Sequence, residues 1–323
     1  CYEPGRWSFL AVEAGRDRGG SSRGSVFVWC AMSRHSLRGL VVFAFVAPLV
    51  AQQPALAPEH AVLKELAGTW SVAGTGVATA AGKAAAYEQL ETAELVCGGF
   101  WLESVLRSGN SEMYWLTGFD PGQHCFVRVR VTGTAEPVVE DGEFDAEKRT
   151  ITWRGRGTVA KRIGVQLVTT LAGSEPRVER MVRVGLDGAA QSMGERVFTR
   201  AKADVLATSE REQRKGPMTE HELLVQLAGD WECAITATMP GQEKPMRSMG
   251  RMHEEVVGDG CLLHSSFASE FGGSKIEGRG LLGFDKKQQR YVRFWADSGS
   301  PVLAISTSAV DETGKKLVGT GTT

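Results

Sequence analysis

Residue types that carry catalysis in enzymes are present in this chain, but their spacing matches no common catalytic motif. Residues 278–283 read GRGLLG, which has the Gly-x-Gly-x-x-Gly form of a dinucleotide-binding loop. A polar segment precedes these residues and a turn follows them, so no helix opens there to present backbone N–H groups to a pyrophosphate. We interpret the glycines as strand residues that permit a bend or close packing. Nucleophile-elbow, Walker and His-Glu-x-x-His signatures are absent from the sequence.

Cysteine and histidine side chains could bind a metal ion, and Cys261 and His264 are of suitable types. Because they are three residues apart, these side chains would point to opposite faces of a strand. We therefore expect no metal site and no cofactor. Apart from Cys1 and Cys30, four cysteines remain, and they allow three disulfide pairings, with free buried thiols as an equal alternative: Cys97, Cys125, Cys233 and Cys261.

The elements that must position such residues are strands. Val127, Val129 and Val131 alternate with Arg128 and Arg130, a period of two that is typical of a half-buried strand with one wetter face. Similar alternation recurs at short intervals, and turn residues such as Asp-Pro-Gly-Gln separate the segments. About 140 residues of this pattern fit an antiparallel up-and-down barrel, whose interior can house a ligand.

The sequence also contains an internal repeat. The segment EHAVLKELAGTW, which begins at Glu59, recurs as EHELLVQLAGDW from Glu220. Further on, GFWLES matches GCLLHS, GFD occurs in both copies, and FVRVR matches YVRFW, all in the same order. Self-similarity over such a span indicates two copies of one domain.

We place the first copy at residues 58–200 and the second at residues 218–323, joined by a polar linker at residues 201–217 that ends in Gly-Pro. The first copy continues with strand-like segments past the point that matches the end of the second. We therefore expect two tandem barrels, of which the second is incomplete at its C-terminal end and has an unpaired sheet edge.

Each copy opens with a short helical pattern. Thr219 and Glu222 have the spacing of a capping box, in which each side chain bonds the other's free backbone N–H. The helices also share a Glu-His pair at their start. No recurring nucleophile accompanies it, which favours a structural role, holding the helix against the barrel mouth, over a catalytic or haem role. The residues of the two pairs are Glu59, His60, Glu220 and His221.

The N-terminal region has the features of a targeting segment. Residues 1–31 are rich in Gly, Arg and Ser without a clear period, and we interpret them as a non-native upstream extension. From Met32 onward a basic stretch, the apolar run from Gly39 to Val50 and a small residue follow in the order of a secretory signal peptide. We predict a signal peptide at residues 32–51 and a protein that is exported, to the periplasm or beyond, with a buried core helix as the alternative. The run is too short to span a membrane, which takes roughly 20 residues.

Composition and charge exclude some classes of protein. An apolar content of 42% and a charged content of 23% are those of a globular chain and exclude a disordered or fibrous one. The 37 Lys and Arg residues nearly balance the 38 Asp and Glu residues. No overall field therefore favours nucleic acid or an anionic membrane as a partner.

The repeated segments make the chain similar to the bacterial family called domain of unknown function 1579. The resemblance implies exported proteins with a lipocalin-like barrel and no assigned activity, and it covers about residues 58 to 323. The residues from Gly68 to Gly76 also resemble the opening strand of calycins, including the nitrobindin-type haem barrels. The similar segments are residues 58–70, 118–120 and 195–200 in the first copy and residues 220–231, 278–285 and 291–298 in the second.

Trp70 and its repeat partner Trp231 follow the glycine that opens the first strand of each copy. An indole at this position can plug the closed end of a barrel while its N–H bonds a neighbouring carbonyl. In calycins an arginine from the last strand packs over that ring, and the resemblance assigns this role to Arg200. A Trp that stacks on a ligand is the alternative.

These features together favour non-catalytic binding of a small lipophilic or aromatic ligand in the barrel cavities. The alternatives are haem binding of the nitrobindin kind and an uncharacterised barrel enzyme. The lack of any histidine between Cys125 and Met218 counts against haem in the first copy, whereas in the second the strands that would carry the histidine are missing. The polar residues that could contribute to a ligand site are Glu103, Arg128 and Asp297.

Overall fold

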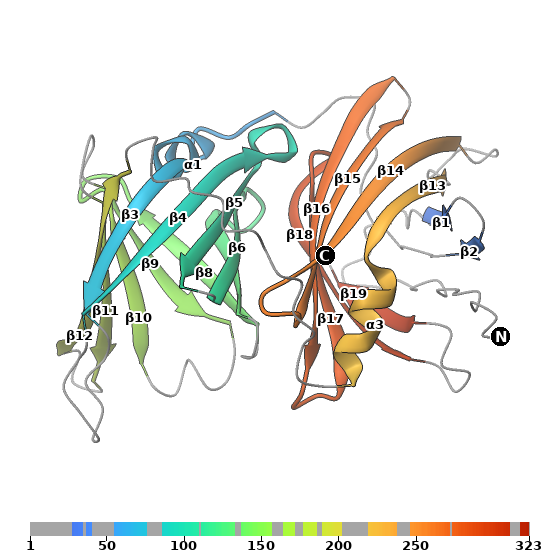
Figure 1. Cartoon of the computed structure of the whole chain (residues 1–323). Helices are drawn as coiled ribbons and strands as arrows, with labels where there is room; N and C mark the ends of the chain where they lie inside the picture. Colours follow the sequence, from blue (N-terminus) through green and yellow to red (C-terminus); the bar gives the residue numbers. More distant parts are fainter. Residues whose placement is uncertain are drawn as a thin grey trace. The chain divides into compact units, whose positions relative to one another are not determined.

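The computed structural model describes most of both repeats, and its described residues form two compact units, which are treated separately (Figure 1). Helix α1 and strands β3 to β12 belong to the first unit, and β1, β2, α3 and β13 to β19 belong to the second. The described ranges are 28–34, 37–40, 55–75, 86–109, 111–132, 137–156, 164–171, 177–185, 189–201, 219–237, 246–271, 273–310 and 317–322. The predicted linker therefore lies outside them except for its first residue.

The first unit is a closed antiparallel barrel of ten strands, preceded by helix α1 (His60–Leu66). The strand order is β10-β11-β12-β3-β4-β5-β6-β7-β8-β9, and pairing of β9 with β10 closes the ring. The strands are β3 (Gly68–Thr75), β4 (Ala86–Val96), β5 (Trp101–Ser108), β6 (Ser111–Asp120), β7 (Cys125–Thr132), β8 (Val138–Asp145), β9 (Thr150–Gly155), β10 (Val165–Thr170), β11 (Arg177–Val184) and β12 (Ala190–Arg200), with the 3-10 turn η1 (Cys97–Gly99) following β4.

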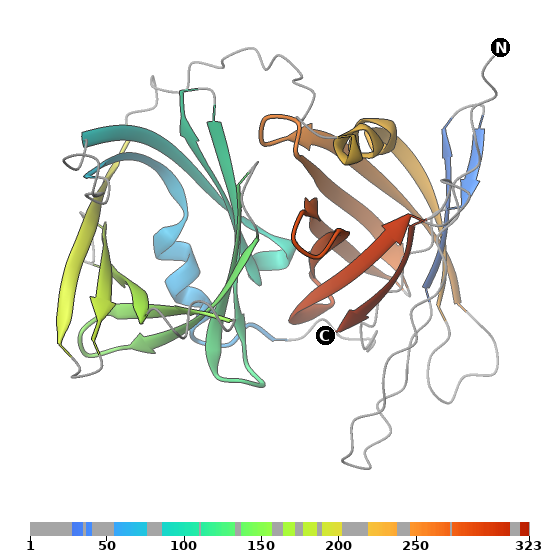
Figure 2. The same ribbon diagram turned by 90° about the horizontal axis from the view of Figure 1, so that it is seen from below.

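Helix α1 lies across one end of this barrel, and in Figure 2 it is seen behind the ring of strands. Its buried residues Val62, Leu63 and Leu66 pack in one apolar cluster with barrel residues that include Phe126 and Trp153. Full burial of a leucine stabilises a fold by about 1.5–3 kcal/mol. Apolar side chains thus fill the helix-covered end of the interior and hold α1 in place.

The second unit is an antiparallel sheet of nine strands, preceded by helix α3 (Glu220–Leu227). Its order is β19-β18-β17-β16-β15-β14-β13-β1-β2, and no pairing between described residues closes it into a barrel. Its strands are β1 (Val28–Arg34), β2 (Leu37–Leu40), β13 (Gly229–Ala237), β14 (Met246–Val257), β15 (Leu262–Phe271), β16 (Ser274–Asp285), β17 (Arg290–Asp297), β18 (Ser300–Val310) and β19 (Leu317–Thr322).

Strands β1 and β2 come from the region predicted to be an upstream extension and the start of a signal peptide, whose remaining residues 41–51 lie outside the described part of the chain. Strand β1 pairs antiparallel with β13 and places Met32 opposite Cys233. In the first barrel β12 pairs with β3 and places Phe198 opposite Val72. Because the repeat aligns Val72 with Cys233, β1 takes the position along β13 that β12 takes along β3.

The repeated Gly-Phe-Asp segment makes the same turn in both units. Asp120 accepts hydrogen bonds from the backbone N–H groups of Gly122 (2.8 Å) and Gln123 (3.1 Å), and the Gln123 side chain donates to its second oxygen (2.8 Å). Asp285 accepts the equivalent bonds two and three residues on, from the Lys287 and Gln288 N–H groups and from the Gln288 side chain. An aspartate that bonds the following backbone in this way stabilises a tight turn between strands.

The predicted mainly β fold is confirmed, with a short helix ahead of each sheet, a closed first barrel and a second sheet that is not closed. The predicted capping box is wrong. Thr219 precedes α3, but no side-chain hydrogen bond caps the helix, and the Thr219 hydroxyl instead donates to Glu220 Oε2 (3.3 Å). The reason is that Thr219 has helical backbone angles (φ −59°, ψ −33°), whereas a capping residue adopts the extended geometry that aims its oxygen at the first turn.

Candidate functional site

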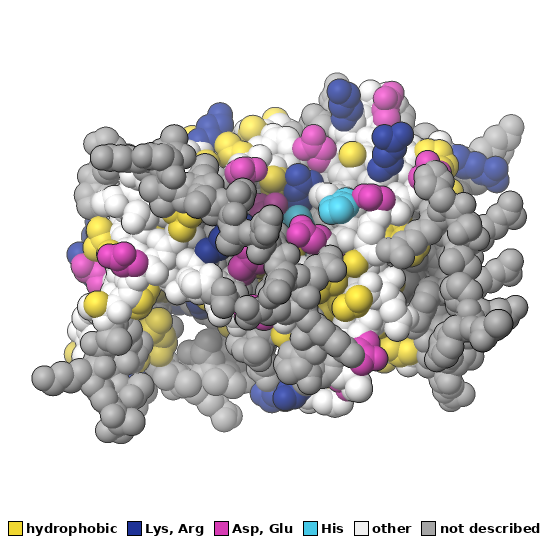
Figure 3. All heavy atoms as spheres, viewed as in Figure 1, with side chains coloured by type: hydrophobic (Ala, Val, Ile, Leu, Met, Phe, Trp, Pro, Cys, Tyr) yellow, Lys and Arg dark blue, Asp and Glu magenta, His cyan; other side chains and the backbone are white. Residues whose placement is uncertain are grey.

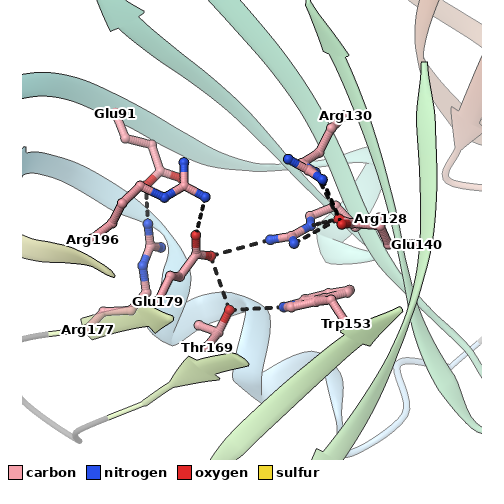
Figure 4. A network of polar contacts seen from close by, with 9 residues as sticks. All are labelled: Glu91, Arg128, Arg130, Glu140, Trp153, Thr169, Arg177, Glu179 and Arg196. Carbon is pink, nitrogen blue, oxygen red and sulfur yellow. Dashed lines mark hydrogen bonds and ion pairs between the residues drawn. The ribbon is translucent and has the colours of Figure 1, made fainter. Parts of the chain in front are cut away.

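Strand β7 shows that the interior of the first barrel is charged. Phe126 and Arg128 lie on one face of the strand and Val127 and Val129 on the other, and all four are buried. Figure 4 shows Arg128 and Arg130 among charged side chains from other strands of the barrel. The wetter face expected at Arg128 is therefore wrong, because the arginines line the interior and the valines cover the outer face. Since both faces are buried here, alternation alone could not show which one points inward.

Nine residues, which we term the interior network, lie together inside the barrel (Figure 4): seven are joined by hydrogen bonds and ion pairs, and Arg177 and Glu91 form a separate pair beside them. They come from β4, β7, β8, β9, β10, β11 and β12, so closure of the barrel is what brings them together. The members are Glu91, Arg128, Arg130, Glu140, Trp153, Thr169, Arg177, Glu179 and Arg196.

Two arginines of β7 share the carboxylate of Glu140. Arg130 binds it through two bonds, from Nε to Oε2 (2.9 Å) and from Nη2 to Oε1 (2.8 Å). Arg128 donates from Nε to Oε2 (2.8 Å), and its Nη2 lies 2.8 Å from the same oxygen without the alignment of a hydrogen bond. Paired bonds between a guanidinium and a carboxylate are among the strongest that side chains form.

Glu179 is the second centre of the interior network. Its carboxylate accepts bonds from Arg196 Nη2 (2.5 Å), Thr169 Oγ1 (3.1 Å) and Arg128 Nη1 (3.4 Å), and Thr169 in turn accepts one from Trp153 Nε1 (2.9 Å). Burial alone would raise the pKa of the Glu179 carboxyl. The charges of the surrounding arginines and the Thr169 bond more than reverse that effect and lower the pKa to about 2. Glu179 is therefore ionised at every physiological pH.

Arg177 extends the network toward the aromatic residues near α1. It forms a buried ion pair with Glu91, and its guanidinium carbon lies 3.7 Å from the ring centroid of Phe198 and 5.1 Å from that of Trp70. Trp115 on β6 lies beside two further guanidinium groups, 5.4 Å from that of Arg128 and 5.3 Å from that of Arg196. Such cation–π contacts add to the stability of cations inside the barrel.

Among the described residues, neither the charges nor the hydrogen bonds of this interior balance. Four arginines face three glutamates, which leaves one positive charge in excess. Trp115 Nε1 and Arg177 Nε are buried donors that have no hydrogen-bond partner in the described part of the chain. A buried donor without an acceptor costs about 1–3 kcal/mol, so an acceptor supplied from outside the chain would be bound favourably here.

Solvent reaches the network from the end opposite α1. The side chain of Arg128 is 3% exposed, whereas that of Arg130, two residues further along the same face of β7, is 29% exposed. Likewise Arg196 is 14% exposed, while its partner Glu179 is 3% exposed. The cationic groups thus lie between the apolar, helix-covered end and the open end of the barrel.

Comparison with known families identifies the repeat. A family model described as Protein of unknown function (DUF1579) matches residues 55–200 and again residues 216–323. The chain belongs to the DUF1579 family. The two successive matches confirm the predicted tandem copies, whereas no curated protein matches the chain.

The Gly-x-Trp segment of each DUF1579 copy ties the first strand to the preceding helix. Trp70 Nε1 donates to the carbonyl of Leu66 (3.0 Å), and Trp231 Nε1 makes the same bond to Leu227 (2.9 Å). Gly68 has φ +132°, and a Cβ there would lie 1.8 Å from Arg200 Nη1, so glycine is required on both counts.

Arg200 packs over the indole of Trp70 at the end of the first DUF1579 barrel where α1 lies. Its guanidinium carbon lies 3.9 Å from the ring centroid of Trp70, and its Nη1 donates to the carbonyl of Ala67 (2.6 Å). These contacts fasten the last strand to the helix C-terminus. Arg177 of the interior network lies near the same ring, 5.1 Å from its centroid.

The paired histidines are buried against the barrels. His60 Nδ1 lies 3.1 Å from the carbonyl of Ala57, and the ring packs edge-on against Phe100 (5.3 Å) and Phe119 (5.9 Å). Burial lowers the pKa of both His60 and His221, so both rings are neutral at pH 7. Their environment is that of a packed core and not of the interior network.

The other residues named from the sequence also lie apart from the network. Glu59 is at the N-cap of α1, and the backbone carbonyl of Glu220 accepts a hydrogen bond from Tyr291 (2.8 Å). Glu103 lies on the face of β5 that alternates with the buried interior residues Leu102 and Ser104, and so points outward. Asp297 ends β17 and accepts a bond from the backbone of Gly299 (2.8 Å).

The second DUF1579 copy has a smaller polar group at the position equivalent to Arg128. Arg293 donates to Glu254 (3.0 Å) and to Ser265 (2.7 Å), and Ser265 donates to Glu254 (2.6 Å). Burial raises the pKa of Glu254, and the nearby Arg293 and Ser265 only partly oppose it. A single guanidinium does not offset the burial of this carboxyl group.

The glycines of the GRGLLG segment lie within β16 and are followed by β17, with no helix between them. A Cβ on Gly278 would lie 2.3 Å from the ring of Trp295, and one on Gly280 would lie 2.9 Å from it. The glycines therefore make room for a tryptophan.

In the described part of the chain, no disulfide joins any two of the cysteines Cys97, Cys125, Cys233 and Cys261. The described ranges hold no group of three or more Cys, His, Asp or Glu residues able to bind a metal ion. Neither α1 nor α3, the helices of those ranges, has the length and apolarity to cross a membrane.

On the face drawn in Figure 3 the described acidic and basic side chains are interspersed.

Of the interior network, only Arg128 was predicted from the sequence. Four members lie in two pairs spaced by two: the predicted Arg128 with the missed Arg130, and the missed Arg177 with the missed Glu179. Charges spaced by two lie on one face of a strand. Two such pairs on different strands were therefore the available sign of a charged face, although not of its direction.

Proposed function

We propose that the first barrel binds a small organic molecule in its interior and catalyses no reaction. The observation that carries the proposal is the pair of buried donors without acceptors, Trp115 Nε1 and Arg177 Nε, in an interior with excess positive charge. Barrels of eight strands already suffice for one small ligand, and diameter grows with strand number, so ten strands support a ligand inside this one.

An apolar surface beside these donors supports a ligand with an apolar or aromatic body, as the sequence also predicted. Trp70, Val72, Leu106, Trp115 and Phe198 form one buried cluster, with Met113 packed against it. Ligand sites commonly combine such apolar walls with a few polar groups that fix orientation. A purely lipophilic ligand fits this interior less well, because it would leave both donors unpaired.

The state of the carboxylates supports binding over acid–base catalysis. A general base works best when its pKa lies near the operating pH. With its pKa lowered to about 2, Glu179 is a weak base, and Glu140 is held by two arginines. The carboxylates therefore neutralise and orient the arginines.

Export is part of the proposal, since the order of basic, apolar and small residues at 32–51 is that of a signal peptide. N-terminal sequencing of the protein recovered from its host tests this directly. A mature chain that begins near residue 52 supports export, and a chain that retains residues 32–51 contradicts it.

Native mass spectrometry of the protein purified from its host tests ligand binding. We expect a co-purified mass of a small organic molecule that collisional activation releases. The variant Met113→Trp adds bulk to the interior face and should lose this mass, whereas Val105→Trp, on the outer face of neighbouring β5, should keep it. Circular dichroism verifies that both variants fold. Protein that never carries an added mass, or that shows a haem Soret band, would falsify the proposal.

A further inference from the structure

We propose that the ligand of the first barrel is a monocarboxylate, whose carboxylate binds at Arg177, Arg196 and Trp115 while its apolar body lies against Val72 and Leu106. This inference rests on the proposed function and specifies the ligand class. It follows from the donors, the charge count, and the apolar surface next to them.

The two donors without an acceptor among the described residues, Trp115 Nε1 and Arg177 Nε, belong to side chains that both lie near Phe198. Trp115 packs in one apolar cluster with Phe198, and the Arg177 guanidinium lies 3.7 Å from the Phe198 ring. Arg196 lies near both rings, 5.3 Å from Trp115 and 5.8 Å from Phe198. An indole N–H and guanidinium N–H groups are donors only, so the group that satisfies them must be an acceptor.

The charge count selects a single negative charge. One carboxylate would neutralise the excess positive charge of the four arginines and three glutamates. A phosphate monoester, which carries close to two negative charges at pH 7, would leave an uncompensated negative charge in a buried site. Guanidinium groups also match the planar geometry of a carboxylate.

The position of Arg196 explains how the carboxylate would enter. Arg196 Nη2 is bonded to Glu179, yet the side chain retains 14% exposure on the side that solvent reaches. A cation at the entrance attracts an anion from solution and then remains beside it when bound. Val72 and Leu106 belong to the same buried cluster as Trp115 and Phe198, and this cluster is the apolar surface nearest the proposed carboxylate position.

Matched pairs of acids and alcohols test this assignment by titration calorimetry on the full chain: 2-naphthoate with 2-naphthylmethanol, octanoate with octanol, and benzoate with benzyl alcohol. We expect at least one acid to bind about tenfold or more tightly than its alcohol, because hydrogen bonds to a charged group are stronger than those to a neutral one. Naphthyl phosphate should bind more weakly than naphthoate.

Two cross-strand pairs of β11 and β12 provide a matched test of Arg196. Glu179 pairs with Arg196 on the inner face, and the next pair, Arg180 with Glu195, forms an exposed ion pair on the outer face. Arg196→Met should remove the preference for acid over alcohol, whereas Arg180→Met should leave it unchanged. If Arg196→Met fails to fold, Trp115→Phe keeps an aromatic side chain but removes the N–H donor, and should weaken acid binding severalfold.

The outcomes separate this inference from the proposed function. Alcohols that bind as tightly as acids, or an equal effect of Arg180→Met and Arg196→Met, overturn the carboxylate assignment and leave small-molecule binding standing. Tighter binding of naphthyl phosphate than of naphthoate overturns it as well. If no member of either set binds, and native mass spectrometry shows no co-purified mass, both proposals are wrong.

Discussion

The two DUF1579 copies place an equivalent arginine in very different surroundings. Arg128 of the first copy shares two carboxylates with other arginines, and there the pKa of Glu179 falls to about 2. Arg293 of the second copy is the arginine beside Glu254, whose pKa is raised by burial. The difference shows that the number of guanidinium groups around a buried carboxylate decides whether burial or charge controls its ionisation.

The copies also differ in what fills the space near that arginine. The matching segments FVRVR and YVRFW put Trp295 where the first copy has Arg130. Trp295 lies against the glycines of β16, and its Nε1 donates to Asp297 (3.1 Å). A large apolar ring thus replaces a cation in the second copy, while the turn at Gly-Phe-Asp is retained. One fold therefore carries two kinds of interior, and only the first has the charge excess on which the binding proposal rests.

The substitutions Glu179→Gln and Glu254→Gln test this difference directly, because each removes the buried carboxylate beside the equivalent arginine. Removing the Glu179 charge leaves buried arginines without their counter-ion, and we expect a loss of about 4 kcal/mol in the free energy of unfolding of the first unit. Glu254→Gln should change the second unit by at most about 1 kcal/mol, because burial already disfavours the charge it removes. Urea titrations followed by hydrogen-exchange mass spectrometry of peptides from β7 and β17 measure the two units separately.

Glu195→Gln, which removes an exposed carboxylate from β12, is the control and should cost no more than about 1 kcal/mol. Equal losses from Glu179→Gln and Glu254→Gln would contradict the idea that the two interiors differ in kind.

The pH dependence of stability sharpens the contrast, because the two copies should respond in opposite directions. Glu179 has a folded pKa of about 2, below its ordinary 4.5, so it stabilises the first unit above pH 4.5. This contribution of about 3 kcal/mol is lost as pH falls from 4.5 to 2. Asp297 has a pKa raised by burial from 3.8 to about 6, so it destabilises the second unit above pH 6. That unit should gain about 3 kcal/mol as pH falls from 6 toward 3.8.

Unfolding midpoints of both units, measured from pH 7 down to pH 2.5, give the two slopes. Glu179→Gln should flatten the acid limb of the first unit, and Asp297→Asn should flatten the rise of the second. A second unit that loses stability between pH 6 and pH 4 would show that Asp297 is not the group that controls this range.

Much of the fold was predictable because it depends on local rules. Period-two alternation, the aspartate turns and the repeated Gly-x-Trp each require only neighbouring residues, and they predicted a mainly β chain with two similar sheets. The interior network was not predictable in the same way. Its members are far apart in sequence: Arg177 on β11 and Glu91 on β4, for example, meet only when β12 pairs with β3.

Local sequence also could not predict that residues 28–34 form a strand, because a basic and apolar segment is compatible with both a signal peptide and an edge strand of a sheet. Alternation on β7 likewise suited either an inward or an outward arginine face. In both cases the choice depends on a long-range partner: β13 for Val28–Arg34, and the opposite wall of the barrel for Arg128.

The two copies also differ in the strand that pairs with their first strand, and we expect this difference to have the smallest effect. Strand β3 pairs with β12 from its own copy, whereas β13 pairs with β1 from the N-terminal region. Deleting residues 1–51 should therefore speed amide exchange in β13 about tenfold, an effect of about 1 kcal/mol, because its edge loses a hydrogen-bonded neighbour. Exchange in β3 should not change. If β13 is equally protected without these residues, the β1 pairing contributes nothing to the stability of the second sheet.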